Sequence, residues 1–470
     1  MAGQSYVLGE QKVQPGIYVR VTNIGEPPVV TGAQGIGAAL IRASWGPLGR
    51  VVTMEGLNEV SQQFGEGHGT EVLRELFRGG ARQVKAVRVG SGGTKGTLTL
   101  EDTSSAPVQV VTLETKYPTS RVFNVTIRDS LTDDKQRELL VFEGTEWLET
   151  ITFEKGTGEP EALTEAINQT SQYLTAQKTE DGNGILAAVV NQNLANGSDP
   201  TVTGESYTNA ETLLEAEDWN ILVVDSVDPT IHATVQVFIN RMRKEGKRVL
   251  GVVGEPTSVD FNTRKANSRV FDDPAIIYVG NGFVSANGNV EGAEAAARVA
   301  GEILRAPYNS SLTHQVINGA VDIIGKLTNA QIVEAIQSGM LVFTRNANGQ
   351  VQIEYGITTF LNPTIELDEG WKKIRRVRTR DELINRVVLS TDPLIGRINN
   401  DANGQATVIS IINGIINQMI AEGGLLSGQA VLDETKPPQG DSAWFKIEVD
   451  DLDSMEKVYF EFGFRYTPAT

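Results

Sequence analysis

The last residues of the chain alternate strictly between apolar and polar positions. One face of an extended segment there carries Val458, Phe460, Phe462, Phe464 and Tyr466, while charged, polar or small residues occupy the other positions. This period of two predicts a terminal β-strand. Because chain ends are usually poorly ordered unless something ties them down, the strand needs a sheet edge, either in its own domain or in another molecule.

The first residues show a shorter version of the same pattern. A Gln-Pro-Gly turn signal at 14–16 is followed by Ile17, Val19 and Val21, which alternate with Tyr, Arg and Thr. We therefore expect residues 1–22 to form an N-terminal arm. Helical spacing of apolar residues within 57–77 and a strand pattern at 84–89 then predict an α/β segment that packs on the core.

The pattern changes in the next part of the chain. Short strand-like runs alternate with turn-forming residues, which predicts a β-rich, β-sandwich-like surface insertion domain. These runs lie at 96–100, 108–113, 123–129, 138–142 and 148–153.

Alternating strands and helices follow. A buried-type strand at 219–225 precedes a helix that Asp228 caps and Pro229 begins, and the next strand lies at 249–253. This order implies a parallel sheet with right-handed crossovers. Beyond it, a helix at 406–422 and a strand at 445–449 predict an α+β domain.

The fold class that we expect is therefore multidomain, α/β plus α+β, with extended arms at both ends of the chain. Six parts follow from the pattern: an N-terminal arm (1–22), an N-terminal α/β segment (23–92), the insertion domain (93–204), a central α/β domain (205–360), a C-terminal domain (361–454) and a C-terminal strand arm (455–470).

Composition and charge exclude several classes of protein. The 470 residues exceed one ordinary hydrophobic core, and the formal net charge of −18 argues against nucleic-acid binding, which requires a cationic surface. The chain has no cysteine, so disulfides and thiolate chemistry are excluded. No run approaches the roughly 18 apolar residues of a membrane span, and the first residues lack a signal-peptide pattern, so we expect no direct membrane insertion.

One basic run stands out in this acidic chain. Six cations lie within nine residues: Lys372, Lys373, Arg375, Arg376, Arg378 and Arg380. Thr379 and Glu382 have the spacing of a capping box, which predicts that a helix begins just after the run. Cations are disfavoured at a helix N-terminus, so we favour an interface with an acidic partner over a solvated face.

Candidate catalytic chemistry is incomplete. Asp225 and His232 follow the chain order of a subtilisin-like triad, but no serine stands in a matching motif. We therefore expect Asp225 to be a turn residue and His232 to belong to the start of a helix, and we assign no catalytic residue. A serine hydrolase of subtilisin-like fold stays open as an alternative.

Cofactor and metal motifs are also incomplete. Ser285 stands where a dinucleotide loop beginning at Gly280 needs its third glycine. The stretch 399–404 opens like a calcium loop, but Ser410 occupies the position of the bidentate glutamate. The three histidines are scattered. We expect loops at both places and assign neither a cofactor nor a metal.

Several segments of the chain are informative through their order and spacing. They are Pro15-Gly-Ile-Tyr-Val19, the glycine-rich run into Trp45-Gly-Pro47, and the stretches 71–81, 327–336 and 458–466. In their order and spacing they resemble the tail sheath proteins of contractile phage tails and related contractile injection particles. The resemblance runs over nearly the whole chain and is weakest in the insertion at 90–204.

The resemblance implies a structural protein, not an enzyme, whose central domain has a subtilisin-like topology without catalysis. Such subunits stack as helical rings around an inner tail tube and contract to drive the tube through a bacterial envelope. The implied partners are further copies of the chain, the tube protein, and baseplate and tail terminator proteins. The implied location is a virion tail or phage-tail-like particle that is assembled in the bacterial host cytoplasm.

The resemblance also assigns roles to residues. The two arms would pair with a sheet in neighbouring subunits through the strand residues Ile17, Val19, Val21, Val458, Phe460, Phe462, Phe464 and Tyr466. The basic run at 372–380 would face an acidic patch on the tube. Another self-assembling shell, such as a surface-layer protein, remains a further alternative.

Overall fold

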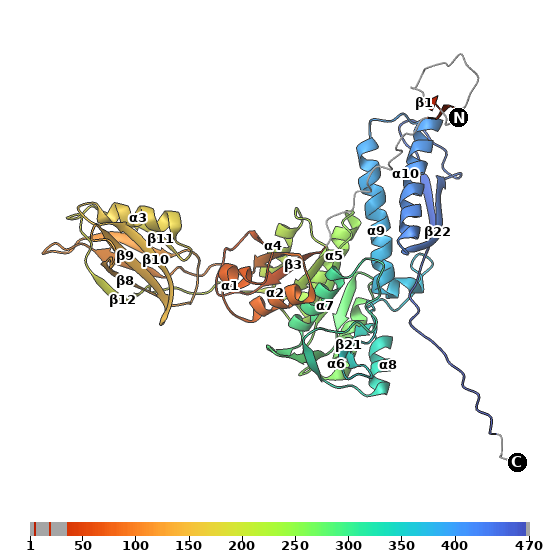
Figure 1. Ribbon diagram of the computed structural model, residues 1–470, viewed down its shortest axis with the longest axis horizontal. Helices are drawn as coiled ribbons and strands as arrows, with labels where there is room; N and C mark the ends of the chain where they lie inside the picture. Colours follow the sequence, from red (N-terminus) through yellow and green to blue (C-terminus); the bar gives the residue numbers. More distant parts are fainter. Residues whose placement is uncertain (1–3, 6–17, 20–34, 467–470) are drawn as a thin grey trace.

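The computed structural model describes residues 4–5, 18–19 and 35–466 (Figure 1). The hydrophobic residues of this part gather into three separate cores, one in a central α/β body, one in a β-sandwich and one in a C-terminal layer. Figure 1 shows the sandwich and the C-terminal layer projecting from the central body in different directions.

A seven-stranded sheet forms the centre of the molecule. All neighbouring strands are parallel except β4 and β5, which are antiparallel. In spatial order the strands are β19 (Met340–Leu341), β15 (Ile276–Val279), β14 (Leu250–Gly254), β13 (Ile221–Val224), β3 (Ile36–Ile41), β5 (Gln83–Arg88) and β4 (Val51–Met54). The N-terminal α/β segment and the central region therefore share one sheet, and the predicted parallel pairing of the central strands is confirmed.

Helices cover both faces of this sheet. Helices α2 and α7 contact each other and the same central strands, whereas α4 and α5 pack on the opposite side. The helices of this body are α1 (Glu59–Phe64), α2 (His68–Gly79), α4 (Gly204–Leu214), α5 (Pro229–Lys244), α6 (Phe261–Phe271), α7 (Ala293–Arg305) and α8 (Asn329–Gln337). The predicted cap is confirmed, because the Asp228 carboxylate accepts a hydrogen bond from the Thr230 N–H at the start of α5.

Smaller strands complete the central body. They form the sheet β17-β16-β18 (Gly288–Val290, Gly282–Ser285 and Ala320–Ile324) and the hairpin β20-β21 (Phe343–Arg345 and Val351–Ile353).

Residues between β5 and α4 form the β-sandwich. Two antiparallel sheets, β10-β9-β8-β12 and β11-β7-β6, enclose the second core, and α3 packs against β10 and β11. The elements are β6 (Thr97–Glu101), β7 (Gln109–Thr115), β8 (Phe123–Asp129), β9 (Gln136–Glu143), β10 (Glu146–Glu154), α3 (Glu159–Thr170), β11 (Leu174–Lys178) and β12 (Val189–Asn193). The five predicted strands are confirmed.

The sandwich is joined to the central body at one place. Its entering and leaving segments run side by side, with reciprocal backbone hydrogen bonds of 3.0 Å between Ser91 and Thr201. Trp45, from the loop after β3, inserts into the sandwich core, where its ring lies 5.1 Å from that of Tyr117 and 5.3 Å from that of Phe123. This contact fixes the sandwich on the central body.

A buried arginine reinforces the same junction. The Arg88 guanidinium donates to the carbonyl oxygens of Ala43 (2.8 Å) and Gly46 (2.8 Å) on the central side and of Pro118 (3.0 Å) in the sandwich. Burial lowers the pKa of Arg88 to about 10. The three carbonyls supply the polar partners that a buried cation requires.

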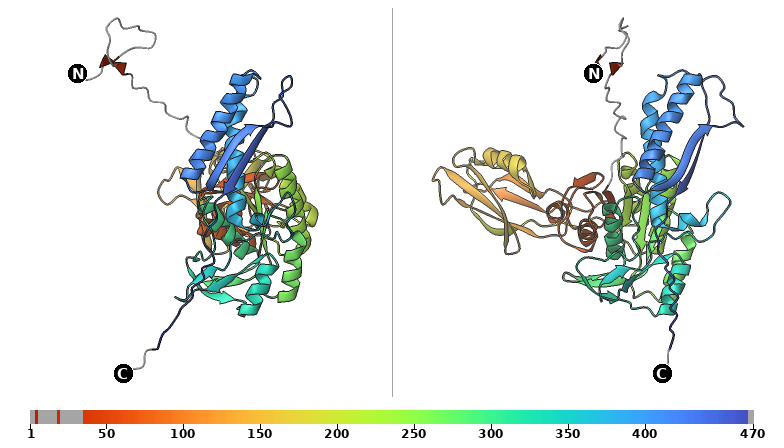
Figure 2. Two further views of the ribbon diagram at one scale, coloured as in Figure 1. Left: turned by 90° about the vertical axis from the view of Figure 1, so that its right-hand side faces the viewer. Right: turned by 45° about the vertical axis from the view of Figure 1, so that its right-hand side comes forward.

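The C-terminal layer consists of two long helices and a hairpin (Figures 1 and 2). Its elements are η1 (Glu369–Lys372), α9 (Ile374–Thr391), η2 (Asp392–Leu394), α10 (Ala402–Ala421), β22 (Leu425–Leu432) and β23 (Phe445–Asp451). The predicted start of the first helix was wrong: α9 begins at Ile374, and the Thr379 hydroxyl donates to the Arg375 carbonyl oxygen instead of capping. Buried Ile374 and Val377 hold the earlier turns against the central core.

Helices α2 and α7 approach each other backbone to backbone. A Cβ atom added at Gly301 would lie 2.4 Å from the Leu76 carbonyl oxygen and 2.7 Å from the Gly79 Cα atom. A buried ion pair between Arg298 and Glu75, 2.9 Å apart, links the same two helices. Larger side chains at the glycines would therefore force the helices apart.

We expect Gly301→Ala to lower the free energy of unfolding by about 1–3 kcal/mol, because overpacking at a backbone contact cannot relax through side-chain rotation. Gly414→Ala in α10 is the matched control, since a Cβ atom there meets nothing within 4 Å. That control should be neutral or stabilising by about 0.5–1 kcal/mol. Chemical denaturation of both variants measures the difference, and equal stabilities would contradict the close packing of α2 on α7.

Candidate assembly site

The structure separates the two residues of the hypothetical triad. The Asp225 carboxylate accepts hydrogen bonds from the Arg42 backbone N–H (2.7 Å), the Arg42 Nε (3.0 Å) and the Tyr207 hydroxyl (2.6 Å). The His232 Nε2 instead lies 2.8 Å from the Ser226 carbonyl oxygen. Burial lowers the pKa of His232 to about 4, so the ring is neutral at physiological pH. Both residues bind their own backbone and side-chain neighbours and do not form a catalytic pair.

The two incomplete ligand motifs also have structural roles. Gly282 lies in β16, where an added Cβ atom would come 2.3 Å from the Val290 carbonyl oxygen, so this glycine serves strand packing. The Asp401 carboxylate caps α10 by accepting from the Gly404 N–H at 2.8 Å. Among the described residues no group of three or more histidine, aspartate or glutamate side chains could hold a metal ion.

The terminal segment leaves the body as an extended chain (Figures 1 and 2). Residues 457–466 belong to no sheet within the described part of the chain. The side chains at alternate positions are exposed, with Phe460 77%, Phe462 76% and Phe464 92% accessible. The Phe462 ring lies 6.2 Å from the Phe460 ring and 6.5 Å from the Phe464 ring, so the three rings form one apolar ridge. Val458 and Tyr466, at the same parity, are exposed as well.

The N-terminal strand residues are described only in part. Val19 lies in β2 (Tyr18–Val19), which pairs in parallel with β1 (Gln4–Ser5). Ile17 and Val21 lie outside the described residues.

The basic run lies in η1 and the first turns of α9. Most of its cations form ion pairs or hydrogen bonds with groups of the same chain. The Arg376 Nε is 2.7 Å from the Asp451 carboxylate, and the Arg380 Nε is 3.1 Å from the same group. Arg380 also lies over the Trp371 ring, 4.6 Å from its centroid. Arg375 and Arg378 donate instead to backbone carbonyl oxygens.

The acidic partners of the run lie where the terminal segment begins. After Asp451, the Asp453 carboxylate lies 2.6 Å and the Glu456 carboxylate 2.8 Å from the Lys373 Nζ. The sequence alone does not reveal this pairing, because the carboxylates are about 70–80 residues away from the cations. The two strongest charge clusters of the C-terminal domain therefore neutralise each other.

The C-terminal sheet has open edges. Within the described residues it consists of β22 and β23 alone, and α10 packs beneath β22. Helix α9 runs beside β23 in the opposite direction, since Arg376 near its start reaches Asp451 at the end of β23. The helical layer is therefore wider than the two strands that cover it.

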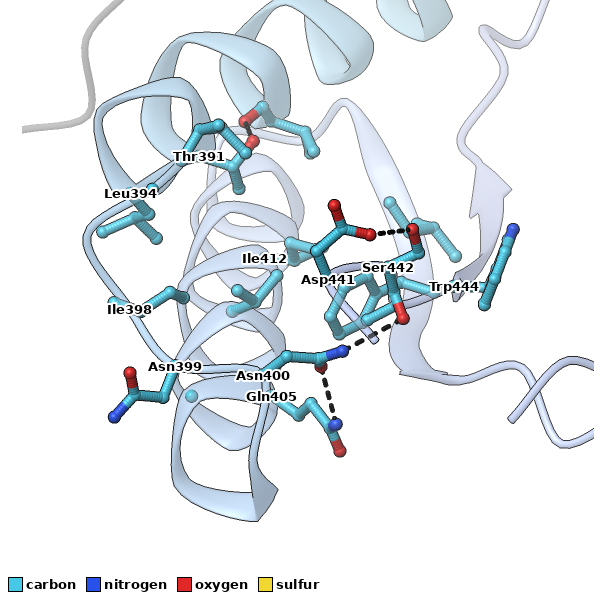
Figure 3. A pocket seen from close by; sticks show the side chains of 18 residues that line it. Thr391, Leu394, Ile398, Asn399, Asn400, Gln405, Ile412, Asp441, Ser442 and Trp444 are labelled. Atoms are coloured by element: carbon cyan, nitrogen blue, oxygen red, sulfur yellow. Dashed lines mark hydrogen bonds between the residues drawn. The ribbon is translucent and has the colours of Figure 1, made fainter. Parts of the chain in front are cut away.

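A groove of about 630 Å³ lies between the far end of α9, the start of α10 and β23 (Figure 3). Its walls are mainly apolar and include Leu394, Ile398, Ile412, Trp444 and Ile447. Hydrogen bonds of 3.0 Å from the Asn400 amide to the carbonyl oxygens of residues 440 and 442 hold the two flanking loops together. Sequence reasoning missed this groove because its walls come from three separate segments.

Comparisons with known proteins identify three regions. The family model described as the phage tail sheath protein beta-sandwich domain matches residues 91–199, the central-domain model matches 201–359, and the phage tail sheath C-terminal domain matches 366–465. Together they cover most of the chain.

Individual relatives match this chain over nearly its full length. The phage-like element PBSX protein XkdK of Bacillus subtilis is 26% identical over 491 residues, which cover 98% of this chain and 99% of that protein. The solved sheath tail protein of Desulfitobacterium hafniense is 23% identical with a TM-score of 0.72, covering 92% of this chain and all of the other. The contracted helical sheath of the anti-feeding prophage is 12% identical with a TM-score of 0.52, covering 97% and 99%.

One charge pair of the site has a testable pH dependence. Burial raises the pKa of Asp451, but hydrogen bonding to Arg376 and the charge of Arg380 outweigh it, so the net pKa is lowered. A carboxyl whose pKa is lower in the folded than in the unfolded state stabilises the fold above its unfolded pKa, and this contribution disappears as the pH falls through the folded pKa.

We therefore expect Asp451→Asn to lower the free energy of unfolding at pH 7 by about 1.5–3 kcal/mol, as for hydrogen bonds to charged groups. The difference from wild type should shrink as the pH drops below about 4, the ordinary pKa of aspartate. Asp450→Asn is the control, because exposed Asp450 only accepts a hydrogen bond from Ser427. A pH-independent difference between Asp451→Asn and wild type would contradict the assignment.

Proposed function

Because the chain belongs to the phage tail sheath protein family, it is a structural subunit of a contractile sheath and not an enzyme, and we propose that its two terminal segments join neighbouring copies by completing shared β-sheets. One observation carries the proposal: the aromatic ridge of residues 458–466 has no partner strand in the described part of its own chain. An extended segment that exposes three aromatic rings and has no partner strand beside it needs a sheet edge elsewhere.

The hairpin β22-β23 supplies such an edge in another copy. A two-stranded sheet is marginal by itself, and its outer edges present unpaired N–H and C=O groups. A third strand beside β23 would lie over α9 and along the apolar groove. Its backbone would pair with β23, and its alternate side chains would enter the groove, which is the usual division of roles in strand addition.

The aromatic ridge fits that position. Three phenylalanine rings bury about 150–250 Å² each when fully covered. The apolar groove accepts such rings, whereas Glu461 and Arg465 on the opposite face of the strand would stay in water. We assign the second edge, along β22, to the N-terminal strand that contains Ile17, Val19 and Val21.

Strand exchange suits a contractile assembly. A contact that joins one surface of a subunit to a different surface of the next copy repeats without closing, which generates a helix of stacked rings. No nucleotide motif is complete in the sequence, so the stroke draws on a conformational difference between extended and contracted packing. The arms keep the copies connected while the bodies move.

The remaining roles come from the family resemblance. We propose that the first turns of α9 face an acidic patch of the inner tail tube. The sheath also contacts baseplate and terminator proteins, and it belongs to a phage tail or phage-tail-like particle that is assembled in the host cytoplasm. A subtilisin-like topology of the central domain and the six-part division of the chain belong to the same proposal.

The cations of α9 are not equally available to a tube. Lys373, Arg376 and Arg380 are paired with carboxylates of their own chain, and Arg375 and Arg378 donate to carbonyl oxygens. Within the described residues the Lys372 ammonium has no ion pair, so it is the cation of the run best placed to meet an acidic partner.

Replacing Phe460, Phe462 and Phe464 together by Ser should abolish sheath assembly, as judged by negative-stain electron microscopy. The variant subunit should keep the thermal stability of wild type, because the three rings contact only one another among the described rings. Serine at Tyr459 and Glu461, on the other face of the strand, is the matched control and should permit assembly. Ordered sheaths from the triple variant would contradict the strand-exchange proposal.

Lys372→Glu should weaken binding to preassembled tubes about two- to fivefold, a range typical of a single exposed ion pair. The effect should fall as salt is raised, since salt screens such contacts. Lys436→Glu, an equal change of charge at an exposed residue of the same layer, is the control. Co-sedimentation with tube protein measures both, and identical binding of the two variants would remove α9 from the tube interface.

A further inference from the structure

The terminal segment does not leave the body freely after β23. Its first residues are held by side chains from two other segments of the chain and by one backbone hydrogen bond to a third. Glu456 accepts hydrogen bonds from the Ser311 hydroxyl (2.7 Å) and the Thr313 hydroxyl (3.0 Å), and it lies 2.8 Å from the Lys373 Nζ. The Glu456 side chain is only 8% exposed, although it belongs to an otherwise exposed segment.

The contacts end abruptly at this residue. Asp451 is bound to Arg376, Leu452 donates its N–H to the Gly424 carbonyl oxygen at 3.1 Å, and Asp453 is bound to Lys373. From residue 457 to 466 the chain makes no hydrogen bond or ion pair within the part that the structure describes. Glu456 therefore marks the boundary between the root of the arm, residues 451–456, which the body holds, and the free strand, residues 457–466.

We propose that Lys373 and Glu456 form a latch, seated by Ser311 and Thr313, which positions the C-terminal arm and holds residues 453–456 in reserve. The proposal rests on strand exchange by the arm, and it adds that the latch controls how far the arm extends from the body. While the latch is closed, the free strand is residues 457–466. When it opens, four more residues are released, which lengthens the arm by about 13 Å at about 3.3 Å per residue.

The groups of the latch can separate when a neighbouring copy pulls on the arm. The Lys373 side chain is 20% exposed, so water can solvate the ammonium as the pair separates. The Ser311 and Thr313 hydroxyls can turn to solvent as well, and no apolar side chain has to be pulled from a core. A strand paired along a neighbour's sheet is held by a row of backbone hydrogen bonds, so the root opens before the strand detaches.

A closed latch also favours assembly. Fixing the root confines the strand to a smaller volume beside the body, which raises its effective concentration at a neighbouring edge. Asp451 and its two arginines, nearer the sheet, remain as a second anchor when the latch is open. Lys373 and Glu456 are thus positioning residues, and they need not contact the neighbouring copy.

The absence of cysteine allows a direct test in the full-length subunit. Spin labels on cysteines introduced at Tyr459 and at Asn417, both exposed, report the distance from the arm to α10 by double electron–electron resonance. We expect one narrow distance distribution in the otherwise unaltered chain. Lys373→Glu and Glu456→Lys should each broaden it at least twofold. The double exchange, made together with Asp453→Asn so that no second carboxylate faces position 373, should narrow it again because the pair is restored with reversed polarity.

Lys446→Glu is the matched control, since Lys446 pairs with Glu448 on β23, away from the arm root, and should leave the distribution unchanged. A distribution that does not broaden in Lys373→Glu, or that stays broad in the double exchange, overturns the latch. Removal of residues 458–470 tests the underlying function separately. Ordered sheaths from that truncation would refute strand exchange by the arm, whatever the distance measurements show.

Discussion

A sheet edge presents a row of N–H and C=O groups that can pair with a further strand, and the C-terminal layer is built around such edges. Within the described residues the hairpin β22-β23 has two such edges, and a helical layer wider than the hairpin lies beneath it. The described part of the chain offers no sheet edge to the exposed aromatic ridge of residues 458–466. In the strand exchange that we propose, neighbouring copies meet each requirement with the other. On this proposal the subunit completes its fold only within an assembly, and the assembly requires no active site.

Periodicity in the sequence was informative wherever burial is one-sided. Five strands of the sandwich were predicted because their apolar residues repeat at the spacing of the element, and the Asp228 cap was predicted from its place before Pro229. The run Ile36–Ile41 lacked that signal: it is buried on both faces, and its glycine and alanines do not mark a strand. Helix α3 and strands β11 and β12, which complete the sandwich, were missed as well.

Charge was harder to interpret than apolar pattern. The basic run was recognised as unusual, but its partners could not be assigned, because Asp451, Asp453 and Glu456 come beside it only after α10 and the hairpin have folded. The helix start was misplaced for a related reason. Cations are unfavourable in a first helical turn only when nothing neutralises them, and here carboxylates from a distant segment do so. Long-range pairing thus changes the meaning of a local signal.

The junction at Trp45 has a further consequence for how the chain is put together. The sandwich enters and leaves the central body through adjacent segments at Ser91 and Thr201, so the central sheet would be continuous without it. What the central body contributes to the sandwich is chiefly one indole ring and the loop that Arg88 secures. The sandwich is therefore a separable insertion. Its surface residues can change without altering the sheets and helices of the rest of the subunit, provided that its core still accommodates the Trp45 ring.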